Sequence, residues 1–392
     1  MNLFYFVGSG MDKEASLGIY NKIIGQIEAL KKCNYKIDLC YTENDTIIIQ
    51  DTFDYQTILC EKVPKKRQRS SKANQLLKFV AGYLAGKSYD VAYIRSGALS
   101  YYSLFFFSLI KRYIKLILIE FPTYPYSFEM LSNASRMGLI EKTRLFRRVL
   151  IDMVVRWVIR AYVDYIVLTI PKNSLWGIPV ISIENAINIE SVSLRNKPEP
   201  LEKIRLFAAT HIATWQGLDR VVYGLHEYEK RARPSNIVIK IAGGGPQKGF
   251  LTDLIKKLHL EDKIIFCGPL KGKLLDELFD EADIAIGSLG RHRQKTNLCS
   301  TLKVKEYCGK GVPFIYSNDE PTLTGNEPFA LKLAADESPV DFNKVVEFVY
   351  ETRRDPKIPY KMRKFAEDHY DWTVQMKKIH KNIFATLDSR LR

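Results

Sequence analysis

Apolar residues follow two patterns along the chain: short continuous runs, and longer stretches in which they recur every three to four positions. The short runs have the length of buried strands, and the longer stretches have the period of amphipathic helices. Strands are predicted at 2–7, 35–41, 90–94, 116–120, 165–169 and 179–183, and again at 204–209, 237–242, 263–267, 283–287 and 312–317. Strands that alternate with helices in this way predict parallel, doubly wound sheets.

A polar segment with two prolines, residues 188–203, separates the two series of strands. We therefore predict an α/β protein with two Rossmann-like domains, at 1–187 and 204–365. A last helical segment, 366–392, is expected to pack back on the N-terminal domain. Ligands of such sheets bind outside the carboxyl ends of the strands, so two facing domains predict a cleft between them.

The chain has 392 residues and a formal net charge of +15, which predicts an anionic partner. That partner is a phosphorylated small molecule, an anionic lipid surface or a nucleic acid. Nucleic acid is the least favoured, because no zinc module or basic stretch with interleaved aromatic residues is present. The apolar run 101–110 is followed by Lys111, Arg112 and Lys115, and so falls short of the roughly 20 residues that cross a bilayer.

Cysteine and histidine usage indicates neither disulfides nor a metal centre. The six cysteines form no C-x-x-C pair, and the six histidines are scattered. Free thiols in a reducing cytoplasm fit this usage, and we expect no metal and no cofactor.

Residues 300–316 predict a short helix that leads into a buried strand. Ser300 and Thr301 are suited to begin the helix, and Gly309 or Gly311 to end it, with Pro313 preventing its continuation. Lys303 lies in the first turn, where the helix dipole disfavours a cation. A bound anion at this helix end would remove that conflict.

Glu306 follows Lys303 by one helical turn. Side chains on a helix lean toward its N-terminus, so this carboxylate is expected near the same ligand. It can accept hydrogen bonds from both hydroxyls of a ribose, while Lys303 and the free amides of the first turn bind a diphosphate. The alternative is a solvated helix face without a ligand.

A glycine-rich turn, 241–247 (IAGGGPQ), follows a predicted strand and precedes a helix. Gly243 and Gly244 allow backbone amides to approach a ligand closely, although a tight strand-to-helix turn explains them equally well. The segment does not match G-x-G-x-x-G, and no acidic residue follows at a dinucleotide-binding distance, which disfavours a nicotinamide cofactor.

Acceptor-side candidates end two strands of the first half. Glu120 could orient an acceptor hydroxyl, with Tyr124 nearby, or it could serve only in a cap or an ion pair. Arg95 ends the preceding strand and could bind either Glu120 or a substrate phosphate.

The segment 144–160 carries Arg144, Arg148, Arg156 and Arg160 on a four-residue repeat with apolar residues between them. This pattern is typical of a helix on anionic lipid and also of a core helix with one solvated stripe. With the basic run Lys65–Arg69, it favours a cytoplasmic protein that is peripheral on the inner face of the cell membrane.

Several motifs together resemble GT-B glycosyltransferases of family 4, of the type found in bacterial surface-polysaccharide synthesis. They are AGGGP at 242–246, CGPL at 267–270, EADIA at 281–285 and KEYCGKGVP at 305–313, with looser matches at 15–23, 183–188 and 215–220. The resemblance covers nearly the whole chain and is more specific in the second half.

The resemblance implies a retaining, metal-independent transfer of a sugar from a UDP- or GDP-sugar to a glycan or lipid-linked acceptor. Glu306 would bind the ribose, the backbone at Gly268, Pro269 and Leu270 the base, and Gly18 the diphosphate from across the cleft. The full set of predicted donor-binding residues also contains Gly243, Gly244, Arg293, Leu298, Cys299, Ser300, Thr301, Leu302 and Lys303. Glu120 and Glu306 are the catalytic candidates.

Three positions depart from the family pattern. Leu298 stands where the family has a first glutamate that contacts the donor sugar, and His211 and Gln216 stand near its phosphate-binding Arg and Lys. The basic loop 290–295, with Arg293, is expected to supply the missing charge, although it could equally be a solvated loop. These departures leave a non-catalytic subunit that binds a glycan or a partner as the alternative function.

Overall fold

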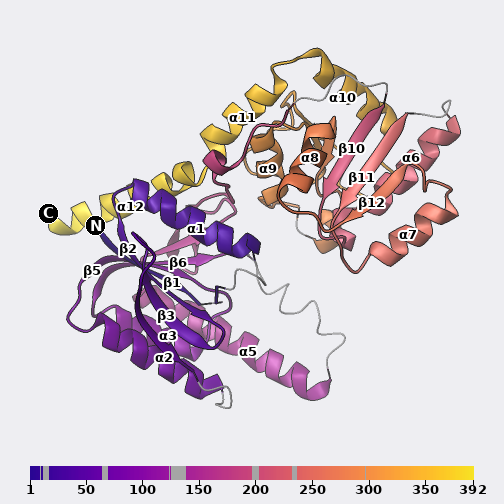
Figure 1. The fold of residues 1–392 in the computed structure, drawn as a ribbon. Helices are drawn as coiled ribbons and strands as arrows, with labels where there is room; N and C mark the ends of the chain where they lie inside the picture. The colour runs from indigo at the N-terminus through magenta and orange to yellow at the C-terminus, as the bar shows by residue number, and fades with distance from the viewer. Residues whose placement is uncertain are drawn as a thin grey trace. The chain divides into compact units, whose positions relative to one another are not determined.

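The computed structural model describes residues 1–8, 10–11, 17–63, 69–122, 124, 138–196, 203–231, 236–295 and 297–392. The predicted basic run Lys65–Arg69 lies outside these residues except for Arg69, and so do residues 15–16 of the family-like match at 15–23 and residues 197–202 of the linker. The chain divides into two compact units, Met1–Glu184 with Trp372–Arg392, and Asn185–Asp371. Each unit is an α/β sheet domain, as the sequence predicts (Figure 1).

Unit 1 is built on a nine-stranded sheet with the order β4-β3-β2-β1-β5-β6-β7-β9-β8. The strands are β1 (Asn2–Val7), β2 (Lys36–Glu43), β3 (Thr46–Asp51), β4 (Thr57–Lys62), β5 (Tyr89–Arg95), β6 (Ile114–Phe121), β7 (Tyr165–Leu168), β8 (Ser174–Leu175) and β9 (Ile178–Ser182). The adjacent strands β2, β1, β5, β6, β7 and β9 pair in parallel. At the edges of the sheet, β3 pairs antiparallel with β2, β4 with β3, and β8 with β9.

Helices cover both faces of the unit 1 sheet. They are α1 (Leu17–Lys32), α2 (Arg69–Leu84), α3 (Tyr101–Ile110), α5 (Leu139–Val158) and α12 (Trp372–Leu391). Figure 1 shows α1 and α12 on one face and α2, α3 and α5 on the other. Successive side chains of β1 point to opposite faces of the sheet, so each face has its own helices to contact. Phe4 and Phe6 join the core beneath α2 and α3, whereas the Tyr5 hydroxyl donates to Gln26 of α1 at 2.5 Å.

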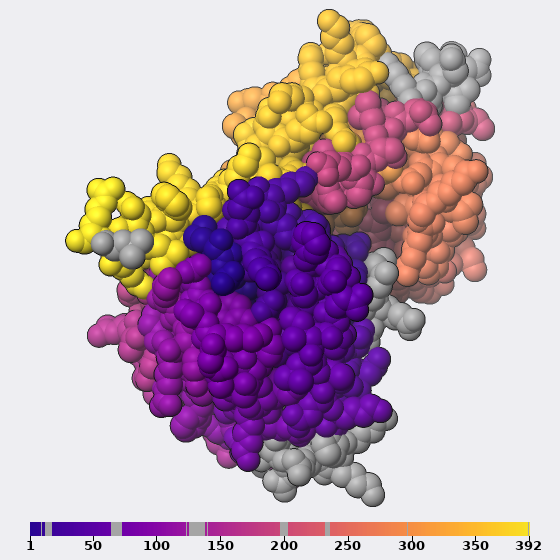
Figure 2. Space-filling model, turned by 60° about the vertical axis from the view of Figure 1, so that its left-hand side comes forward, coloured from indigo at the N-terminus to yellow at the C-terminus, as the bar shows by residue number. Residues whose placement is uncertain are grey.

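The last helix, α12, packs against α1, as predicted for the C-terminal segment. A glycine makes this packing possible, because a Cβ atom at Gly25 would lie 2.2 Å from the Trp372 ring. The two ends of the chain meet in this unit: Figure 2 shows the yellow C-terminal helix beside the indigo N-terminal segment.

Unit 2 is built on a six-stranded parallel sheet with the order β12-β11-β10-β13-β14-β15. Its strands are β10 (Ile204–Ala209), β11 (Ile237–Ala242), β12 (Ile264–Gly268), β13 (Ile284–Ile286), β14 (Phe314–Tyr316) and β15 (Ala330–Lys332). Numbered within the unit, this order is 3-2-1-4-5-6, the Rossmann order, whose ligand site lies where the strand order reverses. In this unit that point is between β10 and β13.

Six helices form the outer layers of unit 2. They are α6 (Leu218–Arg231), α7 (Lys248–Lys257), α8 (Lys273–Glu281), α9 (Leu302–Lys310), α10 (Phe342–Arg354) and α11 (Ile358–His369), with short 3₁₀ turns η4 (Thr214–Gln216) and η5 (Arg291–Gln294). One apolar cluster joins α6, α7 and α10 to the sheet, and a second joins α8, α9 and α11 to it.

The predicted strands are all present, but β3, β4, β8 and β15 were missed. The β2–β3 hairpin turns at Asn44 and Asp45, which have φ values of 46° and 62°. Two residues with positive φ form the turn type that matches the twist of a hairpin. This polar pair was the sequence signal for the missed hairpin. In the described part of the chain, no helix is both long enough and apolar enough to cross a membrane.

Candidate nucleotide-sugar site

The carboxyl ends of β10 and β13 place four segments of unit 2 around the point where the strand order reverses. The 3₁₀ turn η4 and the helix α6 follow β10, and η5 and α9 follow β13, with η4 and η5 in contact. The glycine-rich turn follows β11, next to β10. These segments, together with the loop 298–301 between η5 and α9, contain most of the predicted donor-binding residues.

The glycine-rich turn packs against the loop after β10. A Cβ atom at Gly243, where φ is +133°, would lie 1.8 Å from the Thr210 carbonyl oxygen, and one at Gly245 would lie 2.4 Å from that of Ile212. A Cβ atom at Gly244 would meet nothing within 4 Å. The flanking glycines therefore serve the tight turn, and only Gly244 leaves open space at the candidate site.

The N-terminus of α9 is held by a buried ion pair. Thr301, the residue before the helix, donates its backbone N–H to Glu320 at 3.0 Å and donates its hydroxyl to the same carboxylate. The Lys305 ammonium donates to Glu320 at 2.6 Å, and both of these side chains are fully buried. The Thr301 hydroxyl is thus hydrogen-bonded to Glu320 and does not cap the helix, contrary to the sequence-based expectation.

Ser300 is also used for structure, because its hydroxyl accepts from the Asn185 backbone N–H at 3.1 Å and its carbonyl oxygen accepts from the Asn185 side chain at 2.6 Å. The helix ends at Gly311 in the left-handed conformation, φ +73°, as predicted. The first-turn amides, from Leu302 onward, belong to the set that has no partner within an α-helix.

Lys303 is a cation in the first turn of α9. Its ammonium donates to the Gln216 side-chain oxygen at 2.6 Å, and that oxygen also accepts from the Ser288 hydroxyl at 3.0 Å. Burial and the neighbouring Arg291 charge lower the pKa of Lys303 to about 7, although Glu306 partly opposes them. A second anion at this position would therefore favour the charged form of Lys303.

Glu306 follows one turn later, with part of its side chain open to solvent and its carboxyl surrounded by protein atoms. Loss of hydration raises the pKa of its carboxyl, and the Lys303 and Lys310 charges only partly offset this effect. Lys303 and Glu306 therefore lie one helical turn apart at the end of α9 that faces the reversal point, as the sequence predicts.

The two arginines of η5 have different surroundings. Arg293, the predicted phosphate-binding cation, donates to Asp219 at 2.8 and 2.9 Å and to Glu337 at 2.9 and 3.1 Å. Arg291 donates to Gln294 at 3.0 Å, while its buried Nε atom has no hydrogen-bond partner in the described structure. Arg293 thus anchors the loop through two carboxylates. Arg291 is therefore the better placed of the two arginines to bind a phosphate. The sequence alone could not distinguish them.

The predicted base-binding segment follows β12. Gly268 has a φ of +72°, and its carbonyl oxygen accepts from the Gly243 N–H at 2.7 Å, so the segment is tied to the glycine-rich turn. Pro269 is exposed and Leu270 is half-buried. Leu298 pairs with Asp319 as an isolated bridge and exposes 38% of its surface, and burial raises the pKa of the adjacent Cys299 to about 11.

In unit 1, Glu120 is the centre of a buried charge cluster. The Lys22 ammonium and the Arg95 guanidinium each approach one of its oxygens at 3.1 Å, and the other oxygen accepts from Tyr93 at 2.9 Å and Gln26 at 3.1 Å. These donors fill the acceptor positions of a carboxylate. The geometry therefore favours the ion-pair alternative over a catalytic role for Glu120, and it pairs Arg95 with Glu120.

The remaining predicted residues of unit 1 are Gly18 and Tyr124. Gly18 is exposed in the first turn of α1, and a Cβ atom there would meet nothing within 4 Å. The Tyr124 ring packs at 6.4 Å from the Trp176 ring, and Lys172 lies 5.8 Å from its centre. Residues 12–16, which precede α1, and residues 123 and 125–137, which flank Tyr124, lie outside the described residues.

Comparison with known proteins agrees with this fold. Residues 192–298 match the family model of glycosyl transferases group 1, a segment that includes η4, η5 and Leu298 but ends before α9. The chain has the GT-B fold. No curated protein matches this chain significantly in sequence.

Solved structures resemble the chain over nearly its full length. A glycosyltransferase from Rickettsia africae has a TM-score of 0.63 and 14% identity, with 98% of each chain covered. HepE of Anabaena in complex with UDP has a TM-score of 0.60 and 12% identity, with 98% of this chain and 100% of HepE covered. The lipopolysaccharide outer core galactosyltransferase WaaB has a TM-score of 0.58 and 14% identity, with 98% and 100% covered.

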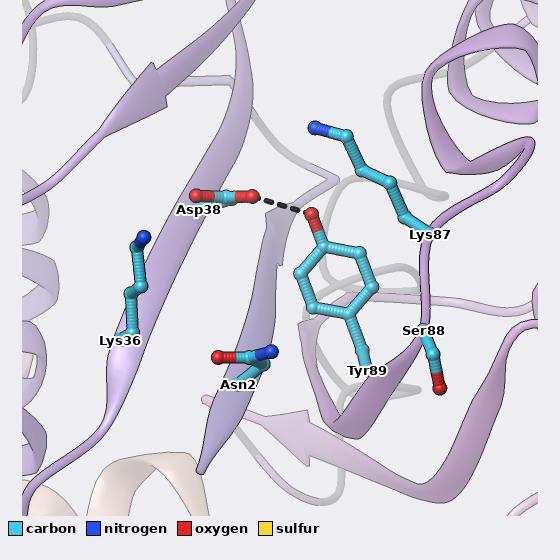
Figure 3. A pocket seen from close by; sticks show the side chains of 6 residues that line it. All are labelled: Asn2, Lys36, Asp38, Lys87, Ser88 and Tyr89. Carbon is cyan, nitrogen blue, oxygen red and sulfur yellow. Dashed lines mark hydrogen bonds between the residues drawn. The ribbon is translucent and has the colours of Figure 1, made fainter.

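The described part of the chain contains no group of three His, Cys, Asp or Glu side chains arranged to hold a metal ion. A pocket of about 240 Å³ does occur in unit 1, where Lys36 and Lys87 lie on either side of Asp38, which accepts from the Tyr89 hydroxyl (Figure 3). It lies at the amino ends of β1, β2 and β5. Because ligands of parallel sheets bind at the carboxyl ends, this pocket is separate from the candidate site.

Proposed function

We propose that this protein is a glycosyltransferase that moves a sugar from a nucleotide-diphosphate donor to a glycan or lipid-linked acceptor in surface-polysaccharide synthesis, with retention of anomeric configuration and without a metal ion. The observation that carries the proposal is the grouping of Lys303, Arg291 and Glu306 at the N-terminus of α9. HepE, a structural relative, was solved with UDP and UDP-glucose, which supports a UDP-sugar as the first donor to test.

The chemistry follows from the charges at this helix end. The leaving group is a nucleoside diphosphate, and its negative charge grows as the bond to the sugar breaks. Lys303, Arg291 and the first-turn amides of α9 form a fixed set of donors that stabilises this charge without a metal ion. Because Lys303 is only partly ionised near neutral pH without a ligand, the diphosphate also draws a proton to its ammonium.

Glu306 binds the ribose hydroxyls in this proposal, and the backbone at Gly268, Pro269 and Leu270 contacts the base. Leu298 lies near the donor sugar, at the position that resembles the family's first glutamate. Its apolar side chain cannot accept a hydrogen bond from a sugar hydroxyl. This favours a nucleotide-sugar whose sugar has fewer hydroxyls facing Leu298.

The acceptor is bound by unit 1, where the Glu120 cluster holds the carboxyl ends of β5 and β6 in place. We propose that the enzyme acts as a cytoplasmic protein that is peripheral on the inner face of the membrane. The net charge of +15 supports attraction to anionic lipid.

A panel of UDP, GDP and their sugars tests the proposal by thermal shift and by titration calorimetry. One base should raise the melting temperature in a concentration-dependent manner, because a ligand that binds only the folded state stabilises it by mass action. Release of nucleoside diphosphate in the presence of an acceptor, with the product's anomeric configuration read by NMR, tests the transfer itself. Absence of binding by every nucleotide would contradict the proposal.

A further inference from the structure

Helix α5 of unit 1 exposes a continuous apolar stripe. Phe146, Leu150, Met153, Val154 and Trp157 are spaced by four, three, one and three residues, which places them on one face of a helix. Their exposed fractions are 66%, 46%, 52%, 64% and 63%, unusually high for five large apolar side chains that are neighbours. We call these five residues the α5 stripe.

The opposite face of α5 already supplies the contacts that hold the helix on the sheet. Val155 and Ile159 are buried in the unit 1 core, and buried Asp152 accepts from the Leu99 backbone N–H at 2.8 Å. Arg156 forms an ion pair with Asp152 and lies 4.9 Å from the centre of the Trp176 ring. The four arginines of the repeat therefore do not share one surface, and the fold does not explain the α5 stripe.

Positive charges border the α5 stripe on both sides. Arg147 is three residues before Leu150 and seven before Val154, and Arg160 is three residues after Trp157 and seven after Met153. Both arginines are exposed, as is Arg144. Asp152 is the only acidic residue between positions 142 and 160, and it is buried.

We propose that the α5 stripe inserts into the surface of an anionic membrane, with Arg144, Arg147 and Arg160 contacting lipid phosphates. A helix that lies in the membrane interface needs this combination of an apolar face and flanking cations. A second copy of the chain is a poorer occupant, because two such surfaces would bring arginines of like charge together. This inference rests on the proposed membrane-surface function, and it names the contact.

The test uses the full-length protein and vesicles of neutral phosphatidylcholine or of phosphatidylcholine with 30–40% phosphatidylglycerol, at roughly physiological salt. The variant Phe146→Ser/Leu150→Ser/Trp157→Ser should reduce partition into anionic vesicles at least about tenfold, because apolar burial drives the insertion. The variant Phe53→Ser/Tyr350→Ser/Tyr360→Ser is the control, since it removes three exposed aromatic rings elsewhere and should bind like the unmutated protein.

Insertion has a direct spectroscopic readout. Lipids brominated in the acyl chain should quench the tryptophan fluorescence of the bound protein, and most of this quenching should be lost in Trp157→Phe while vesicle binding is kept. Arg144→Gln/Arg147→Gln/Arg160→Gln should remove the preference for anionic over neutral vesicles.

Each other outcome overturns the inference. Equal binding by the serine variant and the unmutated protein would show that the α5 stripe does not insert, and absence of binding to any vesicle would do the same. A dimer in sedimentation equilibrium that the serine variant abolishes would assign the α5 stripe to a second copy. Nucleotide affinity, measured in solution on the same variants, should stay unchanged, so a failure of the donor-site proposal would be seen separately.

Discussion

The ammonium of Lys305 and the carboxylate of Glu320 form an ion pair of 2.6 Å with no solvent exposure on either side chain. The same carboxylate accepts the backbone N–H of Thr301, and the Lys305 ammonium lies 4.3 Å from the centre of the Tyr370 ring. A buried pair adds little net stability by itself, but removal of one partner leaves an uncompensated charge. The pair therefore fixes the start of α9, where we propose the donor site.

The variant Lys305→Met should lower the free energy of local unfolding at α9 and β14 by about 3–5 kcal/mol, because Glu320 then stays buried without a counter-charge. Hydrogen exchange, read by mass spectrometry on peptides from α9 and β14, measures this quantity locally. The double variant Lys305→Met/Glu320→Gln should recover most of the loss, since a glutamine still accepts from Thr301. If Lys305→Met alone lowers the free energy of local unfolding by less than about 1 kcal/mol, the ion pair does not fix the start of α9.

Glu306→Gln tests the ribose contact. Loss of the charged acceptor should weaken nucleoside diphosphate binding by about 1.5–3 kcal/mol, the usual contribution of a hydrogen bond to a charged group. Titration calorimetry measures the change, and Glu261→Gln is the matched control, because Glu261 is exposed at the amino end of β12. Unchanged affinity in Glu306→Gln would remove this residue from the donor site.

The pH dependence of nucleotide binding tests Lys303. Burial, with the neighbouring Arg291, lowers the pKa of Lys303 to about 7, so in the free protein the ammonium is present below that pH and is lost above it. A bound diphosphate favours the charged form. Between pH 7.5 and pH 9 the nucleotide must therefore bind together with a proton, and affinity should fall by up to about tenfold per pH unit.

Lys303→Gln should bind more weakly at neutral pH and should lack this slope. Calorimetry in two buffers with different ionisation enthalpies would reveal the proton taken up by the unmutated protein. A slope that persists in Lys303→Gln would place the titrating group elsewhere.

Much of unit 2 could be predicted because its determinants are local. The apolar runs of β10 and β11 gave the bounds of those strands, and Gly311 gave the end of α9. Lys303 and Glu306 could be assigned to the helix end for the same reason. Partners that come from far along the chain could not be predicted: Glu320, which fixes Thr301, and Gln216, which accepts from Lys303, carry no signal near α9.

Helix α5 shows a second kind of limit. Its sequence has apolar residues on more than one face, and periodicity does not say which face packs on the sheet. The four-residue repeat of arginines suggested a single basic surface, whereas the structure places Arg156 against Asp152 and Trp176. In the same way, the strand-end position of Glu120 predicted a catalytic carboxylate, but only the neighbouring strands and α1 revealed that four donors surround it.

The Glu120 cluster should make the stability of unit 1 sensitive to acid. Burial alone would raise the pKa of Glu120, but the Arg95 and Lys22 charges outweigh this effect and hold the pKa at about 2, against an ordinary value of 4.5. Because the pKa in the folded state is the lower one, the stabilisation is present above pH 4.5 and is lost as the pH falls toward 2. Its size is on the order of 3 kcal/mol.

Hydrogen exchange of β5 and β6 at a series of pH values measures this loss, and Glu120→Gln should show a smaller acid dependence from a lower starting stability. Nucleotide binding at neutral pH, which involves residues of unit 2, should survive the substitution. An acid dependence equal to that of the unmutated protein would show that Glu120 is not the group that titrates.

Metal independence of the transfer is the last prediction. In the described structure the cations near the predicted diphosphate position are Lys303 and Arg291, and no group of three potential metal ligands accompanies them. If these side chains and the amides of α9 stabilise the leaving diphosphate, the rate should change less than about twofold in excess chelator. Lys303→Gln should then be about 10²–10³-fold slower, the usual effect of losing one preorganised donor at a developing negative charge. Magnesium or manganese should not restore that variant. A rate that disappears in chelator and returns with either metal would assign the charge stabilisation to a bound ion and leave Lys303 a supporting role.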